Sequence, residues 1–129
     1  MAQIKIFGLK SHLDNAKKEL SDTIHRCIVD SLSFPQEKRY HRFIPLQQDE
    51  MIFPDDKSER YTIIEIMMME GRTVETKKRL IRSLFQSIEA DHGIPPADIE
   101  ICIIESPASN WGFRGMTGDE IKLGYQVDV

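Results

Sequence analysis

Apolar and polar residues alternate along this chain in two patterns, one with the period of a strand and one with the period of a helix. The period of two, which is typical of strands, occurs in four segments: residues 3–7, 42–46, 61–69 and 99–105. Residues 61–69, YTIIEIMMM, are apolar in both alternating sets and contain one charge, Glu65. A strand with this composition is covered on both of its faces. The sequence therefore predicts four strands, the third of them deeply buried.

Two longer segments have apolar residues every three or four positions, which predicts helices with one buried face. The first spans about residues 13–32, with Ser11 placed to cap its start and Pro35 following its end. The second spans about residues 73–92, and Gly93 follows it. A serine cap satisfies free N–H groups at a helix start, whereas glycine and proline end helices. Both helices are therefore expected to be long and to stop where these residues stand.

The same order of elements occurs in both halves of the chain. Strand, glycine, long helix, proline and strand are found in about residues 1–60 and again in 61–129. This repeat indicates a duplicated β-α-β unit. Two right-handed units that share a sheet give an α/β fold, with a four-stranded mixed sheet and two helices on one face. We expect residues 1–129 to form a single domain, because 129 residues is an ordinary length for one core.

The second face of this predicted sheet has no element of the chain to cover it. The strands are apolar on both faces, and apolar strand residues do not usually remain in contact with water. Another copy of the same sheet is the simplest cover, so we expect a closed homo-oligomer.

The charge balance and the absence of long apolar runs exclude several kinds of partner. The 129 residues have a formal net charge of −4, which argues against a nucleic-acid partner. The sequence contains no run of about 18 apolar residues, the length that a membrane-spanning helix requires, and no signal peptide is recognised. We therefore expect a cytoplasmic protein. The histidines lack the spacing of a metal site: His12, His25, His41 and His92. Neither a metal nor a cofactor is predicted, since the glycines of residues 112–118 have no nucleotide-binding spacing and resemble a flexible tail.

Four short motifs occur in a characteristic order: PQEKRY at 35–40, GRT at 71–73, GIPPAD at 93–98 and NWGF at 110–113. Together they resemble the malonate semialdehyde decarboxylase-like branch of the tautomerase superfamily, over nearly the whole chain. The ending WGFRGMTGDE also resembles a bacterial subgroup near that branch. The resemblance implies a homotrimer of β-α-β subunits. It also implies a catalytic amine at the mature N-terminus, an aspartate, arginines that hold a substrate carboxylate, and an aromatic wall.

The N-terminal proline of that superfamily is absent, and Ala2 stands in its place. If Met1 is removed, Ala2 offers a primary α-amine that can serve as a base or form a Schiff base. If Met1 is retained, the Ala2 nitrogen is an amide and has no lone pair for catalysis. The amine of Met1, displaced by one residue, is then the alternative.

Two more positions depart from the family pattern, while others match it. Lys38 stands where the aspartate is expected, and Glu70 replaces one of two arginines. Arg72 matches the other arginine, at a strand end beside a helix start, where a guanidinium and free backbone amides suit a carboxylate. The substrate-binding candidates are Arg72, Lys38, Arg39, Trp111 and Phe113.

Each of these candidates also has a structural explanation that the sequence leaves open. Arg72 could form a salt bridge, and Lys38 with Arg39 could lie in a solvated turn. Trp111 and Phe113 could be core or interface aromatics.

Two functions are consistent with this sequence. The first is a homotrimeric tautomerase-like protein that binds a small carboxylate or 2-oxo acid, with weak or altered isomerase or lyase activity because the proline is absent. The alternative is a non-enzymatic trimeric binding or scaffold module with a lapsed active site. Whether the chain is an enzyme is left open by the sequence.

Overall fold

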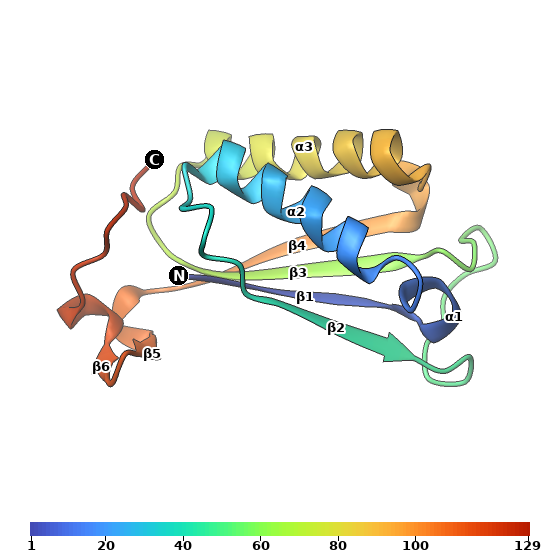
Figure 1. The fold of residues 1–129 in the computed structure, drawn as a ribbon, viewed down its shortest axis with the longest axis horizontal. Coiled ribbons are helices and arrows are strands. Elements are labelled where there is room, and N and C mark those ends of the chain that lie inside the picture. The colour runs from blue at the N-terminus through green and yellow to red at the C-terminus, as the bar shows by residue number, and fades with distance from the viewer.

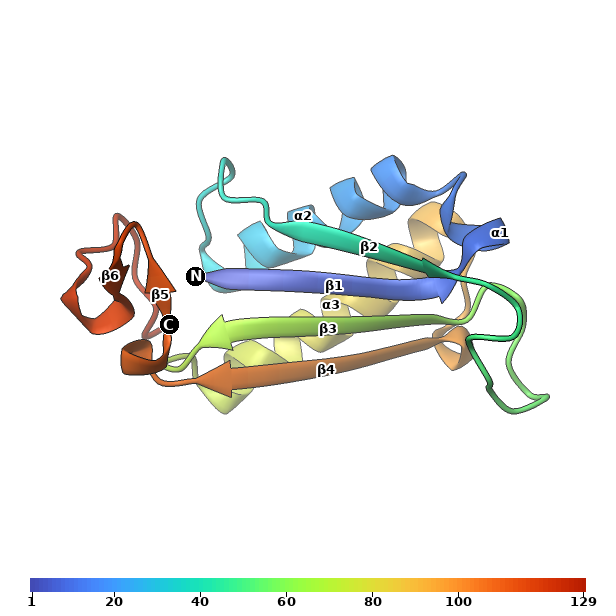
Figure 2. The same cartoon turned by 90° about the horizontal axis from the view of Figure 1, so that it is seen from below.

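The computed structural model describes residues 1–129 as a sheet covered on one face by two long helices (Figures 1 and 2). The strands of the sheet are β1 (Ala2–Leu9), β2 (His41–Leu46), β3 (Thr62–Met69) and β4 (Ile99–Ser106). The helices are α1 (Lys10–Leu13), α2 (Lys17–Leu32) and α3 (Val74–His92). Short elements complete the chain: η1 (Pro96–Asp98), η2 (Ala108–Asn110), β5 (Gly112–Phe113), β6 (Met116–Thr117) and η3 (Gly118–Glu120).

The strand order β2-β1-β3-β4 confirms the predicted fold class. Strand β1 is parallel to β2 and antiparallel to β3, and β3 is parallel to β4. The two β-α-β units therefore meet at the antiparallel pair in the middle of the sheet. Helices α2 and α3 lie side by side on one face, as Figure 1 shows, and Figure 2 shows the sheet from the face without helices.

The main core lies between the sheet and the two long helices. In the register of β1 with β3, Ile4 is opposite Ile66 and Ile6 is opposite Ile64, and all four are almost fully buried. The helices bury their apolar faces against these residues: Leu20, Ile24, Leu80 and Leu84. Each buried aliphatic side chain contributes about 1.5–3 kcal/mol relative to exposure. This packing fixes the sheet against the helices and so positions both ends of the strands.

The start of the first helical segment differs from the prediction. Gly8 remains inside β1, and a Cβ at this residue would lie 3.0 Å from the Leu13 side chain, so α1 packs closely on the strand. The helix breaks after Leu13, and α2 starts at Lys17 without a side-chain cap. Ser11 therefore does not cap the start of the long helix as predicted; it lies inside the short helix α1 instead.

Helix α3 follows the prediction at both ends. The Thr73 hydroxyl accepts a hydrogen bond from the Thr76 backbone N–H, at 3.1 Å, and caps the start. Gly93 ends the helix with φ of 69°, a left-handed conformation that glycine adopts without strain. The chain segment before this helix therefore has a defined path from the end of β3.

The glycine-rich segment after β4 is folded, in contrast to the predicted flexible tail. Strands β5 and β6 form a hairpin whose two-residue turn is Arg114-Gly115, with φ of 55° and 73°. Two positive φ angles are typical of a type I′ hairpin turn. The chain end then returns to α3, where the Val129 carbonyl accepts hydrogen bonds from Thr73 N (3.0 Å) and Thr76 Oγ1 (2.9 Å).

The face of the sheet opposite the helices carries apolar side chains that stay partly exposed. Phe7, Ile63 and Met67 are half-buried there, and Ile104 is 42% exposed. No helix of the structure has both the length and the apolar character required to cross a membrane. The second face is only partly apolar, in contrast to the predicted strand pattern, because polar residues of the strands alternate onto it as well: Gln3, Lys5, Glu65 and Glu100.

Gly71 provides a test of how the C-terminal tail is held. Its φ is +140°, and a Cβ would lie 2.8 Å from Val127 Cγ1. We expect Gly71→Ala to lower the free energy of unfolding by about 1–3 kcal/mol, because the alanine is strained and also pushes the tail away. Gly124→Ala is the control, since a Cβ there has no neighbour within 4 Å. Urea titration measures both, and equal effects would contradict the described path of the tail.

Candidate functional site

The chain N-terminus lies at the end of the sheet where β1 begins and β3 finishes. The Met1 carbonyl accepts a hydrogen bond from Met69 N, at 3.1 Å, which extends the pairing of these strands by one residue. Figures 1 and 2 show that the β5–β6 hairpin and the C-terminal tail lie at this same end. Segments from both repeat units therefore meet around the N-terminal amine.

The Met1 amine is surrounded by positive charge. Its N–H donates a hydrogen bond to Tyr125 Oη, at 2.6 Å. Burial, followed by the positive charges of three side chains, lowers the pKa of this amine from 8.0 to about 5: Arg72, Lys38 and Arg114. At neutral pH the amine is therefore uncharged and keeps a lone pair. We call these three side chains, the Met1 amine and Tyr125 the cationic site.

Ala2 is 1% exposed and lies in β1, opposite Met68 of β3. In the chain that begins with Met1, its nitrogen is a backbone amide and cannot act as a base. The amine of the cationic site is then that of Met1, the alternative that the sequence left open. The role predicted for Ala2 applies only to a chain from which Met1 has been removed.

Arg72 is buried in the cationic site with most of its donors unused. It is 5% exposed, and Nη1 donates to the Met69 carbonyl at 3.1 Å, while Nε and Nη2 are buried without a partner. Arg72 forms no salt bridge within the chain, and nearby Glu105 pairs instead with Lys77 at 2.7 Å. An unpaired buried donor costs about 1–3 kcal/mol, and more when it is charged. These two nitrogens are therefore buried donors that no group of the chain satisfies.

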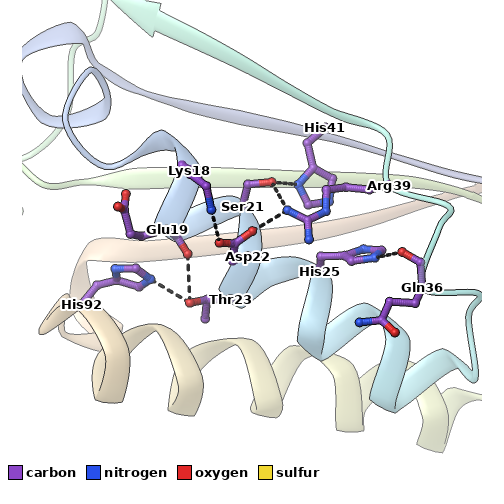
Figure 3. Close-up of polar contacts among 10 residues, drawn as sticks. All are labelled: Lys18, Glu19, Ser21, Asp22, Thr23, His25, Gln36, Arg39, His41 and His92. Atoms are coloured by element: carbon purple, nitrogen blue, oxygen red, sulfur yellow. Dashed lines mark hydrogen bonds and ion pairs between the residues drawn. The ribbon is translucent and has the colours of Figure 1, made fainter.

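Lys38 and Arg39 are adjacent in sequence but are oriented differently. Lys38 is half-buried and contributes positive charge to the Met1 amine. Arg39 turns toward α2, where Nη1 donates to Asp22 Oδ1 at 2.6 Å, as Figure 3 shows. The structure thus brings Lys38 into the cationic site, whereas Arg39 is engaged in an ion pair on the helix.

Two histidines hold the loop that carries Lys38. His25 Nε2 donates to the Gln36 carbonyl at 2.6 Å, and His41 Nδ1 lies 2.7 Å from the hydroxyl of Ser21 (Figure 3). Burial, followed by the nearby His25 and Arg39, lowers the pKa of His41 to about 4, so it is neutral at pH 7. Both contacts join the loop to α2, one on each side of Lys38.

Trp111 and Phe113 lie on the segment that leads into and forms the hairpin. Trp111 is half-buried, and its Nε1 is a buried donor without a partner. Phe113 lines a surface hollow of about 410 Å³ formed by hairpin residues, and the Arg114 guanidinium lies 5.7 Å from the centre of its ring. These aromatics stand at the end of the sheet that holds the cationic site; contact with a substrate remains a prediction for both.

Tyr125 and Arg114 also belong to the cationic site, although no sequence motif indicated a role for either residue. The ring of Tyr125 packs edge-on against Phe34, with centroids 4.9 Å apart, and burial raises the pKa of its hydroxyl. Its contact with Met1 joins residues 124 positions apart, which no local pattern indicates. The hairpin that carries Arg114 could have been predicted, because Arg-Gly between Phe113 and Met116 is compatible with a tight turn.

Comparisons with known proteins agree on one family. A sequence model of the family described as "Tautomerase enzyme" matches residues 38–114, more than half of the chain. A probable tautomerase of Ralstonia nicotianae is 41% identical over 54 residues, covering 42% of this chain and 77% of the relative. A 2-hydroxymuconate tautomerase of Pseudomonas putida is 37% identical over 57 residues, covering 44% of this chain and 90% of the relative. These relatives match a length close to one of the two repeat units.

Solved structures agree on the fold over nearly the full chain. Malonate semialdehyde decarboxylase is 24% identical, covers 88% of this chain and 92% of its own, and superposes with a TM-score of 0.79. A protein described as native fused 4-OT is 22% identical, covers 92% of this chain and 98% of its own, and has a TM-score of 0.83. Malonate semialdehyde decarboxylase thus shares the fold of this chain. The family suggested by the sequence motifs is therefore confirmed: the chain belongs to the tautomerase family.

Proposed function

We propose that this protein is a tautomerase that binds a small 2-oxo acid in the cationic site and uses its N-terminal amine as the base. The observation that carries the proposal is Arg72, whose Nε and Nη2 are buried and unpartnered. A carboxylate accepts two parallel N–H bonds from a guanidinium, which matches these two free nitrogens. The substrate carboxylate is therefore placed at Arg72, with Lys38 adding positive charge.

The amine supplies the chemistry that tautomerisation requires. A base moves one proton between carbon and oxygen, and it works best when it is uncharged at the working pH. The pKa of about 5 leaves the Met1 amine uncharged at neutral pH. If Met1 is removed, the amine of Ala2 takes this role. In either form the amine is primary and lacks the rigidity of proline, so weak or altered isomerase or lyase activity is expected.

The remaining predicted binding residues have unequal support. Trp111 and Phe113 are proposed as the aromatic side of the site, because they lie on the segment that carries Arg114 into it. Arg39 has least support, since its guanidinium is paired with Asp22. The non-enzymatic scaffold has no observation in its favour, because a buried, unpartnered guanidinium weakens a fold that does not use it.

Replacing Arg72 tests this function. The test substrates are phenylpyruvate, a simple 2-oxo acid, and 2-hydroxymuconate, which the name of a relative supports. We expect Arg72→Lys to raise KM about 10- to 100-fold, because it keeps the charge but loses the paired donors, each charge-assisted bond contributing about 1.5–3 kcal/mol. Stopped-flow absorbance measures the turnover, and thermal melting verifies the fold.

The control for that experiment is Arg82→Lys, at an exposed position on α3. A KM for Arg72→Lys equal to that of wild type would contradict the placement of the carboxylate. No turnover by wild type, combined with activity gained in Ala2→Pro, would instead show that the catalytic function has lapsed.

We also propose that the protein assembles as a homotrimer through the face of the sheet without helices. This face carries the partly exposed apolar residues Phe7, Ile63, Met67 and Ile104. Proteins of this fold include one described as an asymmetric trimer and another described as a symmetric trimer. Packing three such faces together removes this apolar surface from water.

Ile104→Lys tests the assembly. Placing a charge on the proposed interface should convert the trimer to monomers, because an unpaired buried charge costs several kcal/mol. Light scattering coupled to size-exclusion chromatography measures the mass. Ile52→Lys introduces the same charge at a loop position that is 95% exposed and should remain trimeric. A wild-type protein with the mass of one chain would overturn the proposal.

A further inference from the structure

Tyr125 is the one uncharged side chain of the cationic site, and it is held in a defined position. Its ring packs on Phe34, with an angle of 66° between the ring planes. The tail that carries it is fixed four residues later, where the Val129 carbonyl accepts from Thr73 N and Thr76 Oγ1. The phenol is thus placed by packing on one side and by the start of α3 on the other.

The contact between Tyr125 and the Met1 amine joins two groups that can both exchange protons. The amine N–H donates to Tyr125 Oη at 2.6 Å. Burial raises the pKa of the phenol, and burial with nearby cations lowers that of the amine, so both groups are uncharged at neutral pH. The amine donates in its charged form; once both groups are uncharged, the hydrogen bond between them must open before a third molecule can use the amine lone pair and the phenolic proton.

We propose that Tyr125 is a catalytic residue, the general acid that protonates the carbonyl oxygen of the substrate while the N-terminal amine removes a proton from the neighbouring carbon. This assignment rests on the proposed tautomerase function and adds to it a second proton-transfer group. A positioned acid or base of this kind contributes about 10²- to 10⁴-fold to a rate.

The proton transfers balance within the site. The amine lone pair takes a proton from the α-carbon, and the electrons of that C–H bond form the C=C bond of the enol. The π electrons of the C=O bond take the proton of the Tyr125 hydroxyl, which leaves an ammonium and a phenolate. The ammonium then passes its proton to the phenolate through the existing hydrogen bond. Both groups return to their starting forms, and no other reactant is needed.

The positive charges around Tyr125 favour these proton transfers. The transient phenolate is the form that positive charge stabilises, and both Arg72 and Arg114 lower the pKa of Tyr125 against the effect of burial. The carboxylate on Arg72 holds the substrate while these transfers occur. Arg72 therefore binds the substrate and also makes proton donation by Tyr125 less costly.

Tyr125→Phe is the test, because it keeps the ring on Phe34 and removes only the hydroxyl. We expect kcat for phenylpyruvate enolisation to fall about 100-fold with KM changed less than threefold. Tyr61→Phe is the matched control: its ring packs on Phe53, with centroids 5.1 Å apart, and it does not influence the pKa of Tyr125. A kcat for Tyr125→Phe within twofold of wild type would overturn the assignment.

A second measurement separates this assignment from the proposed function. The pH dependence of labelling of the N-terminal amine by acetic anhydride gives the pKa of the amine without any turnover. A hydrogen bond to Tyr125 favours the charged amine, so Tyr125→Phe should lower this pKa relative to wild type. If wild type turns over no 2-oxo acid, the proposed function fails. In that case, a lower pKa of the N-terminal amine in Tyr125→Phe than in wild type would still support the hydrogen bond between Met1 and Tyr125. An unchanged pKa of the amine would overturn it.

Discussion

The burial of positive charge without a carboxylate partner is the constraint on which this site depends. Arg72 is 5% exposed and keeps two donors without a partner, while Glu105, the nearby acid, is paired with Lys77. An arrangement of this kind is costly for the folded chain alone. An anion that binds these donors would offset that cost. In the chain alone, the positive charges help to lower the pKa of the N-terminal amine, so that it is uncharged at neutral pH.

The fold supplies this constraint through contacts between its two halves. The antiparallel pair of β1 and β3 places the N-terminus beside the end of β3, and Gly71 lets the chain turn there with the tail against it. The end of the tail is bound at the first turn of α3, which brings Tyr125 over the amine. The duplicated β-α-β architecture is thus the frame, and the added C-terminal segment completes the site.

Local sequence patterns predicted the strands and helices, because these elements depend on residues that are close together in the chain. Alternation of apolar residues located the four strands, and apolar residues at three-to-four spacing, with Gly93 after them, located helix α3. The break between α1 and α2 was missed, although it falls at Asp14-Asn15, two residue types that favour turns. Arg72 could be selected from a motif, but Tyr125 could not, since its role depends on a contact across 124 positions.

The central claim is that the fold holds an uncharged amine among buried cations, and titration of that amine tests it most directly. Labelling of the N-terminus by acetic anhydride, followed by mass spectrometry, should rise with pH through a midpoint near 5, because only the neutral amine reacts. Arg114→Gln should raise that midpoint, since it removes one positive charge, while Arg82→Gln should leave it unchanged. A midpoint near 8.0, the ordinary value for an α-amine, would contradict the account.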